Sequence, residues 1–113
     1  MTQSKYEWHK IASEPGSIHF NKDQVACFEI AERKICIGKY HDQYFAFSSK
    51  CPHAGGNMSE GYIDVLGNAV CPVHRYKFNL RNGRDTMGEG YRLKTYPLEL
   101  RDDGVFVGIE VLF

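Results

Sequence analysis

The chain has 113 residues and a mass of 12.9 kDa, which is the length of one ordinary domain and too short for a multidomain enzyme. Its 14 basic and 14 acidic side chains balance, so no general attraction to nucleic acid or to an anionic membrane surface is expected. Four cysteines are too few for a secreted module stapled by several disulfides, and no apolar run approaches the roughly 20 residues of a membrane span. The first seven residues also lack the apolar stretch of a signal peptide. We therefore expect a soluble cytoplasmic protein that folds as a single domain over residues 1–113.

Short runs that alternate between apolar and polar residues follow one another along the chain, and no helical periodicity is present. The first clear pair of runs, 26–30 and 35–37, flanks a polar break, and this pattern predicts a β-hairpin. A turn at 40–44 then leads into another apolar run at 45–47. These segments predict consecutive antiparallel strands.

The second half of the chain continues the same pattern. Its strand candidates are separated by turn residues and lie at 62–65, 69–71, 96–100 and 105–111. Asn82-Gly83 is a strong tight-turn signal, because both residues tolerate positive φ. Pro97 removes one ladder donor, which places its strand at the edge of a sheet. The sequence therefore predicts an all-β protein, built as an antiparallel sandwich or barrel.

Two loop-like segments interrupt the alternation, and each contains a cysteine beside a histidine. The first holds Cys51 and His53, the second holds Cys71 and His74, and seventeen residues separate His53 from Cys71. One hairpin fits in that interval and brings the two loops side by side. Two thiolates and two imidazoles can close a tetrahedral zinc site, or they can bind a two-iron, two-sulfide cluster with two ligands on each iron.

The order C-x-H, a gap of seventeen residues, then C-x-x-H resembles the Rieske family. Further similarity extends over most of the chain, in the segments C-P-H-A-G at 51–55, S-E-G at 59–61, Phe78, Asn82-Gly83 and 93–97. The resemblance implies a Rieske-like antiparallel sandwich or barrel, with a small cluster-binding subdomain of two loops at about residues 48–84. It also implies one [2Fe-2S] cluster.

The same resemblance implies a role for each ligand. Cys51 and Cys71 would hold the inner iron as thiolates, and His53 and His74 would hold the outer iron and form the solvent-facing exit for an electron. The chain is most similar to soluble, oxygenase-associated Rieske ferredoxins, which implies a one-electron carrier rather than an enzyme. Its redox partner proteins would be a flavin reductase as donor and a terminal oxygenase or another reductase as acceptor.

Two alternatives remain open at this point. The chain also resembles the small Rieske-like subunit of assimilatory nitrite reductases, although some members of that branch lack the ligands that are intact here. A binding module with structural zinc is the third interpretation.

The chain departs from the Rieske proteins of cytochrome bc-type complexes at two pairs of positions, and from many relatives in a third loop. Gly56 and Val73 stand where those proteins have two further cysteines that form a disulfide. Tyr76 and Phe78 stand where a serine and a tyrosine donate hydrogen bonds to the cluster, and fewer donors predict the lower part of the Rieske range of roughly −150 to +300 mV. Finally, 87–90 reads M-G-E-G where many relatives have a proline-containing lid, so this third loop is either more mobile or closes the cluster by another route.

Two other groups of residues have a structural and a functional interpretation. Basic residues follow the second ligand loop at Arg75, Lys77, Arg81 and Arg84. They form either a solvated strand face or a basic collar that steers an acidic redox partner. Cys27 and Cys36 lie on the first predicted hairpin and share one face if Phe28 and Ile35 share the other, although the pattern does not determine the exact register. We expect two reduced thiols there, with a cross-strand disulfide as the alternative.

Overall fold

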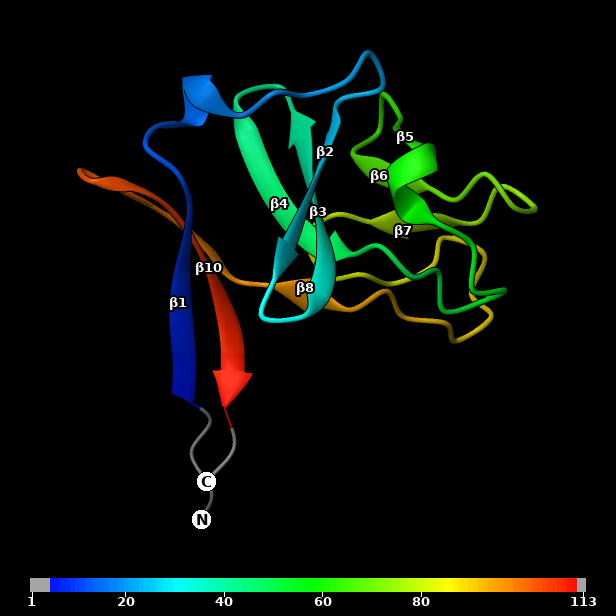
Figure 1. Cartoon of the computed structure of the whole chain (residues 1–113). Helices are drawn as coiled ribbons and strands as arrows, with labels where there is room; N and C mark the ends of the chain where they lie inside the picture. Colours follow the sequence, from blue (N-terminus) through cyan, green and yellow to red (C-terminus); the bar gives the residue numbers. More distant parts are fainter. Residues whose placement is uncertain (1–4, 112–113) are drawn as a thin grey trace.

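The structure is a computed structural model that describes residues 5–111. Within this range the chain forms ten strands in three antiparallel sheets and two short 3-10 helices, at Pro15–Ser17 and Met58–Glu60 (Figure 1). None of the helices in the described range is long and apolar enough to cross a membrane. The antiparallel all-β prediction is confirmed.

The middle sheet is built from consecutive hairpins in the order β2-β3-β4-β8. Its strands are β2 (Val25–Ile30), β3 (Arg33–Tyr40), β4 (Gln43–Ser48) and β8 (Thr95–Tyr96). A two-residue turn joins β2 to β3, and both of its residues, Ala31 and Glu32, have positive φ, at 49° and 64°. Such a turn matches the right-handed twist of the flanking strands. The predicted first hairpin is therefore present, with Cys27 directly opposite Cys36.

A second sheet covers one face of the middle sheet, in the order β1-β10-β9. Its strands are β1 (Lys5–Ala12), β10 (Gly104–Val111) and β9 (Leu98–Arg101). Pro97 lies between β8 and β9, where the chain leaves the middle sheet and enters this one. Both β8 and β9 are edge strands of their sheets, as the proline predicted. The sequence pattern did not reveal β1, which is held by its pairing with β10.

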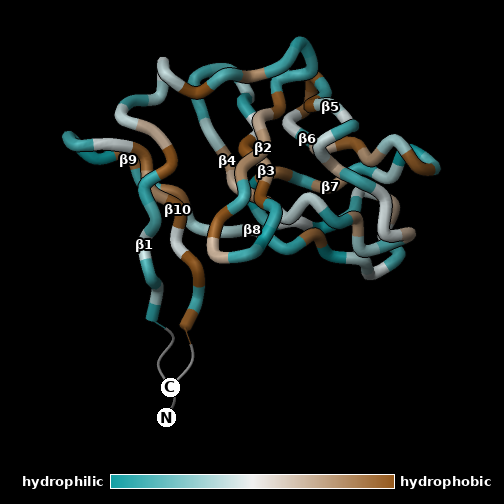
Figure 2. Tube along the Cα trace, viewed as in Figure 1, coloured by the Kyte–Doolittle hydropathy of each residue, from teal (hydrophilic) through white to brown (hydrophobic). Residues whose placement is uncertain are grey.

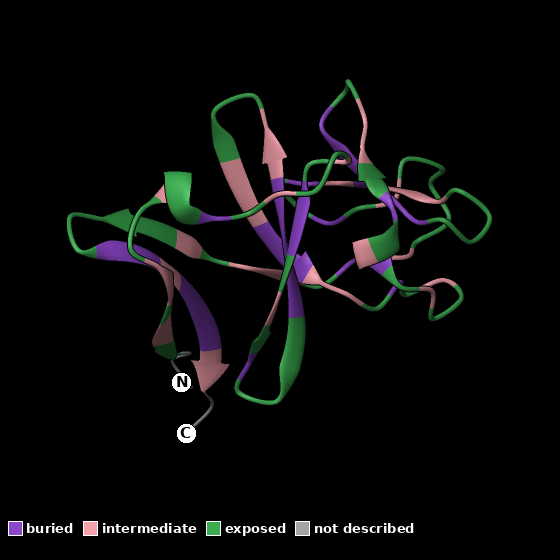
Figure 3. Ribbon diagram, turned by 45° about the horizontal axis from the view of Figure 1, so that its top comes forward, coloured by how far each residue is buried: buried purple, intermediate pink, exposed green. Residues whose placement is uncertain are grey.

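Alternate residues of β3 and β4 pack against opposite neighbours. One face presents Ile35, Ile37 and Ala46 to Val107 and Ile109 of β10. The other face, which includes Cys36 and Phe47, shares a second core with the ligand loops. Figure 2 shows the apolar stretches of these strands, and Figure 3 shows that buried residues gather in the centre while the outer loops are largely exposed. The middle sheet is thus buried on both sides.

The third sheet is small and positions the two ligand loops. Its strands, in the order β5-β6-β7, are β5 (Tyr62–Ile63), β6 (Asn68–Val70) and β7 (Lys77–Asn79). The first ligand loop ends at the helix Met58–Glu60 just before β5, and the second connects β6 to β7. In Figure 1 this sheet and its loops lie at the side of the molecule opposite β1 and β10.

Candidate metal centre

Backbone hydrogen bonds fold each ligand loop back on itself. In the first loop the Cys51 N–H donates to the Gly56 carbonyl at 2.8 Å, and the Gly55 N–H donates to the Cys51 carbonyl at 2.8 Å. In the second loop the Cys71 N–H donates to the Tyr76 carbonyl at 2.8 Å. Each cysteine therefore lies at the base of its loop, and each histidine lies toward the tip.

The two cysteine thiols are buried together. Cys51 is 1% exposed and Cys71 is fully buried, in a core that also contains Met58 and Phe78. Burial raises the pKa of the Cys71 thiol to about 11; the Val73 N–H opposes the rise, and a hydrogen bond with Cys51 adds to it. Two thiolates would repel each other here, so the deprotonated pair requires a bound cation, as coordination to iron provides.

The two imidazoles lie farther out, with their ring centroids 5.6 Å apart and nearly perpendicular. His74 is exposed and has a positive φ of 60° at the tip of its loop. His53 is half-buried, and its Nδ1 atom is buried without a hydrogen-bond partner among residues 5–111. A buried nitrogen without a partner is costly in an apo site, and it fits a nitrogen whose partner is a metal.

The four donors thus form an inner pair and an outer pair. Across the described part of the chain, no three His, Cys, Asp or Glu side chains converge on the position of one metal ion. A structural zinc needs four donors around one ion, whereas a Rieske cluster has two cysteines on one iron and two histidines on the other. The inner pair of thiols and the outer pair of imidazoles therefore fit the donor set of a two-iron cluster.

Comparison with known protein families agrees with this geometry. The model of the Rieske [2Fe-2S] domain matches residues 8–97. The chain belongs to the Rieske [2Fe-2S] domain family. The expected cofactor, one [2Fe-2S] cluster, is confirmed on this basis.

Several Rieske relatives are ferredoxin subunits. The 3-phenylpropionate/cinnamic acid dioxygenase ferredoxin subunit of Photorhabdus laumondii is 30% identical over 76 residues, which cover 66% of this chain and 72% of that protein. The anthranilate 1,2-dioxygenase ferredoxin subunit of Burkholderia cepacia is 28% identical over 105 residues, which cover 91% and 93% of the two chains.

Solved structures share the fold at lower sequence identity. The ferredoxin of carbazole 1,9a-dioxygenase from Nocardioides aromaticivorans has a TM-score of 0.74 and 18% identity, covering 88% of this chain and 95% of that one. A putative NADH-dependent nitrite reductase small subunit from Mycobacterium tuberculosis has a TM-score of 0.77 and 16% identity, covering 93% and 96%. Both comparisons support the Rieske fold.

Gly56 and Val73, the positions where the resemblance places the disulfide of cytochrome bc-type Rieske proteins, are neighbours in space. A Cβ atom placed on Gly56 would lie 3.3 Å from the Val73 Cβ and 2.9 Å from the Cys71 Sγ. The first distance is slightly shorter than the roughly 3.5–4.5 Å Cβ separation of disulfides, so the two positions are near enough in space for the pairing that the resemblance implies for their counterparts. The second shows that the backbone of the first loop approaches the buried Cys71 sulfur closely, so a side chain at position 56 would require a local shift.

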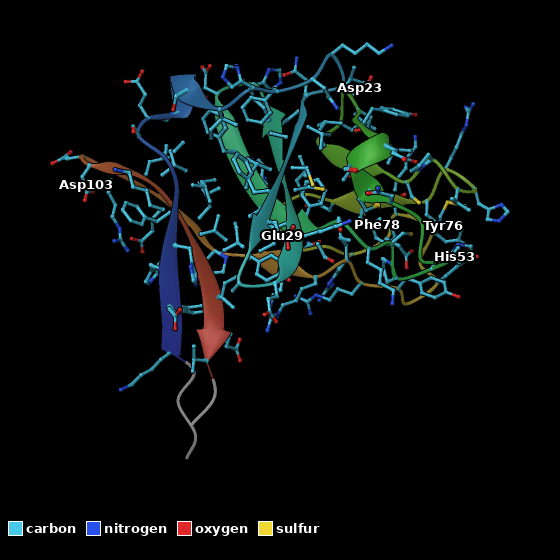
Figure 4. All side chains as sticks on the ribbon, in the orientation of Figure 1. Asp23, Glu29, His53, Tyr76, Phe78 and Asp103 are labelled. Atoms are coloured by element: carbon cyan, nitrogen blue, oxygen red, sulfur yellow. The ribbon has the colours of Figure 1, made fainter. Side chains whose placement is uncertain are left out.

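Tyr76 packs on His53 instead of pointing at the buried thiols. Its ring stacks on the imidazole at a centroid distance of 3.8 Å, and its hydroxyl donates a hydrogen bond to the Glu89 carboxylate. That bond raises the pKa of Tyr76 to about 12, so the hydroxyl keeps its proton. Figure 4 shows His53 and Tyr76 together at the outer end of the molecule, with Phe78 farther in.

The third loop is held closed by residues that the sequence analysis did not single out. The Asp85 carboxylate accepts hydrogen bonds from the N–H groups of Met87, Glu89 and Tyr91. Desolvation opposes ionisation of Asp85, but these N–H groups prevail and lower its pKa. Tyr91 then meets the His53 ring edge to face at 5.1 Å. These contacts favour the second alternative for this loop, closure by another route; an aspartate ahead of two glycines was the available signal.

Proposed function

We propose that the protein is a one-electron carrier in which Cys51 and Cys71 hold one iron of the cluster and His53 and His74 hold the other. When bound, the cluster supplies reversible one-electron oxidation and reduction. The observation that carries the assignment is the pair of buried thiols, together with a His53 Nδ1 atom that is buried without a hydrogen-bond partner among residues 5–111. The apolar side chains around the thiols exclude water, while exposed His74 leaves one edge of the site open to a partner.

The proposed partners follow from the named relatives. Ferredoxin subunits of two dioxygenases are similar to this chain over most of its length. We infer that a reductase delivers the electron and that a terminal oxygenase or another oxidoreductase receives it, so the chain transforms no organic substrate itself. The cytoplasmic location expected from the sequence stays a prediction. The cluster-binding subdomain predicted at about 48–84 is best drawn to include the third loop, because Tyr91 contacts His53.

Two of the four basic side chains of the proposed collar already have polar partners, which leaves two arginines as its candidates. Lys77 lies 3.8 Å from the Asp64 carboxylate, and Arg81 donates to Gln43 away from the histidines. Among residues 5–111, Arg75 and Arg84 are exposed and form no ion pair within 4.0 Å. Arg75 follows His74 directly, so a partner that approaches the exposed imidazole meets its charge.

Charge neutralisation tests the collar. Arg75→Gln with Arg84→Gln should slow reduction by an acidic partner at low salt and leave the rate at high salt nearly unchanged, because salt screens long-range attraction. Arg101→Gln is the control, since Arg101 already pairs with Glu99 at 2.9 Å. A parent protein whose reduction rate does not depend on salt would show that the collar has no steering role.

A redox titration followed by electron paramagnetic resonance tests the carrier itself. The parent protein should give the signal of a mixed Cys/His cluster, and His74→Ala should lose it while its β-sheet circular dichroism is retained. His41→Ala is the matched control, because His41 is an exposed turn residue outside the site. A cluster spectrum that survives His74→Ala would refute the ligand assignment, and a colourless protein with one zinc per chain would favour the zinc module.

The nitrite reductase small subunit remains the second candidate, supported by likeness of fold to the Mycobacterium tuberculosis protein. Reconstitution separates the two functions. A carrier restores electron flow from a reductase to an added terminal oxygenase, whereas a subunit co-purifies with a larger nitrite-reducing chain and is required for its activity.

A further inference from the structure

Cys27 and Cys36 face each other across the β2–β3 hairpin, outside the ligand set of the cluster. Both are free thiols. The position of the turn determines which kind of pair they form. In a hairpin closed by a two-residue turn with positive φ at both positions, the flanking residues Ile30 and Arg33 form a hydrogen-bonded pair.

Pair types alternate along an antiparallel ladder, and Cys27 is three residues before Ile30. The cysteines therefore form a non-hydrogen-bonded pair. The other end of the hairpin also indicates a non-hydrogen-bonded pair. There the Lys39 N–H donates to the Gln24 carbonyl at 2.9 Å, so Gln24 and Lys39 form a hydrogen-bonded pair three residues from each cysteine. Residues in non-hydrogen-bonded pairs have Cα atoms about 4.5 Å apart and side chains on the same face, within the 4.4–6.8 Å range of disulfides. A bond between these two sulfurs requires no change of register.

The two thiols differ in access. Cys36 is fully buried in the core that the middle sheet shares with the ligand loops, whereas Cys27 is exposed. Burial, and then the neighbouring Cys27 thiol, raises the pKa of Cys36. An oxidant from solution therefore meets Cys27 first, and Cys36 lies behind it as the only cysteine opposite it in the ladder.

We propose that Cys27 and Cys36 form a dithiol oxidation site for peroxides. The Cys27 thiolate attacks one oxygen of hydrogen peroxide, the O–O bond breaks, hydroxide leaves, and Cys27 becomes a sulfenic acid. The Cys36 sulfur then attacks the Cys27 sulfur, the S–O bond breaks, and the departing hydroxide takes the Cys36 proton as water. In total, two thiols and one peroxide give one disulfide and two waters, and a dithiol reductant reverses the change by thiol–disulfide exchange. The site is independent of the proposed electron-carrier function, because neither cysteine is a cluster ligand.

Peptide mapping tests the proposal on the cluster-loaded protein. The protein is treated with hydrogen peroxide, alkylated in denaturant and digested with trypsin, which cuts at Arg33 and Lys34 between the two cysteines. A Cys27–Cys36 bond links peptide 23–33 to peptide 35–39, and dithiothreitol separates them. A Cys51–Cys71 bond stays within peptide 51–75 and is told apart by mass. We expect the linked pair, the loss of two free thiols per chain, and no loss of cluster absorbance.

Two variants keep the test falsifiable. Cys36→Ala removes the resolving thiol, so Cys27 should accumulate as sulfenic acid that dimedone traps, and then as sulfinic acid. Cys27→Ser changes only an exposed residue and should protect Cys36 from the same peroxide dose. The proposal is overturned if Cys27 over-oxidises equally fast with and without Cys36, or if the linked peptides come only from two different molecules.

Discussion

Replacing Tyr76 by phenylalanine removes one hydroxyl group and keeps the ring that stacks on His53. In the structure that hydroxyl is committed to Glu89 on the third loop. It therefore supplies no hydrogen bond to the buried sulfur atoms. Phe78 stands at the other position where the resemblance implies a hydroxyl in cytochrome bc-type Rieske proteins, and it has none. We expect the reduction potential of Tyr76→Phe to lie within about 20 mV of the parent value, which corresponds to about 0.5 kcal/mol for one electron.

If the Tyr76 hydroxyl donated to a cluster sulfur instead, its removal would change the reduction potential by a clearly larger amount. Hydrogen bonds to charged acceptors contribute about 1.5–3 kcal/mol, and those to a cluster strengthen when it takes up an electron. A differential of about 1 kcal/mol between the two redox states changes a one-electron potential by about 43 mV, since 59 mV is a tenfold change in the equilibrium constant. If Tyr76 donated to a cluster sulfur, its loss would therefore lower the potential by roughly 40 mV or more.

The assay is a redox titration at fixed pH and salt, followed by electron paramagnetic resonance. Tyr40→Phe provides the control, because the Tyr40 hydroxyl donates to the Val65 carbonyl at 2.8 Å, away from the cluster loops. A fall of about 40 mV in Tyr76→Phe that is absent in Tyr40→Phe would refute the reasoning and show that the hydroxyl serves the cluster.

Two further predictions concern the loops around the site. Gly83→Ala should lower the free energy of unfolding by more than the roughly 1–2 kcal/mol cost of a left-handed non-glycine residue, because the new Cβ also meets the Leu93 carbonyl. Gly88→Ala is the control, because Gly88 has nearly the same φ as Gly83, 74° against 76°, and open space where a Cβ would lie. Denaturant titration should therefore show a smaller loss of unfolding free energy for Gly88→Ala. Equal losses in the two variants would show that the contact with the Leu93 carbonyl does not contribute. Asp85→Ala should speed hydrogen exchange of the amides at 86–91 with little effect on global stability, and unchanged exchange would show that the carboxylate does not hold the loop.

The strands that follow short turns could be predicted, because their signals are local. The polar break before Arg33 and the turn after Tyr40 lie inside single hairpins, where alternation and turn residues act over a few positions. The strand Lys5–Ala12 gave no such signal. Its pairing partner is at the other end of the chain, Gly104–Val111, and that pairing determines its conformation. Pro97 marked two features of the fold: the edge of a sheet and the point where the chain passes from one sheet to the other.

The spacing of the cysteines and histidines predicted the candidate donors, but it did not predict the side chains that pack around them. The interval between His53 and Cys71 holds one hairpin, and a hairpin returns the chain to its starting edge, so spacing alone brings the two loops together. The contact of Tyr76 with Glu89 depends on two side chains thirteen residues apart that meet over the site. No periodicity encodes such a meeting, because it is set by how the third loop packs against the second.

The doubly buried middle sheet explains how so short a chain provides both a scaffold and a redox site. One face of β3 and β4 is stabilised by the sheet that contains β10, so the opposite face is free to support the ligand loops. Those loops need only turn back on themselves, since the thiols at their bases are covered by the sheet below. His74 and the adjacent Arg75 are both exposed on the second ligand loop. A chain of zero net charge therefore carries a local positive charge beside the exposed imidazole of His74.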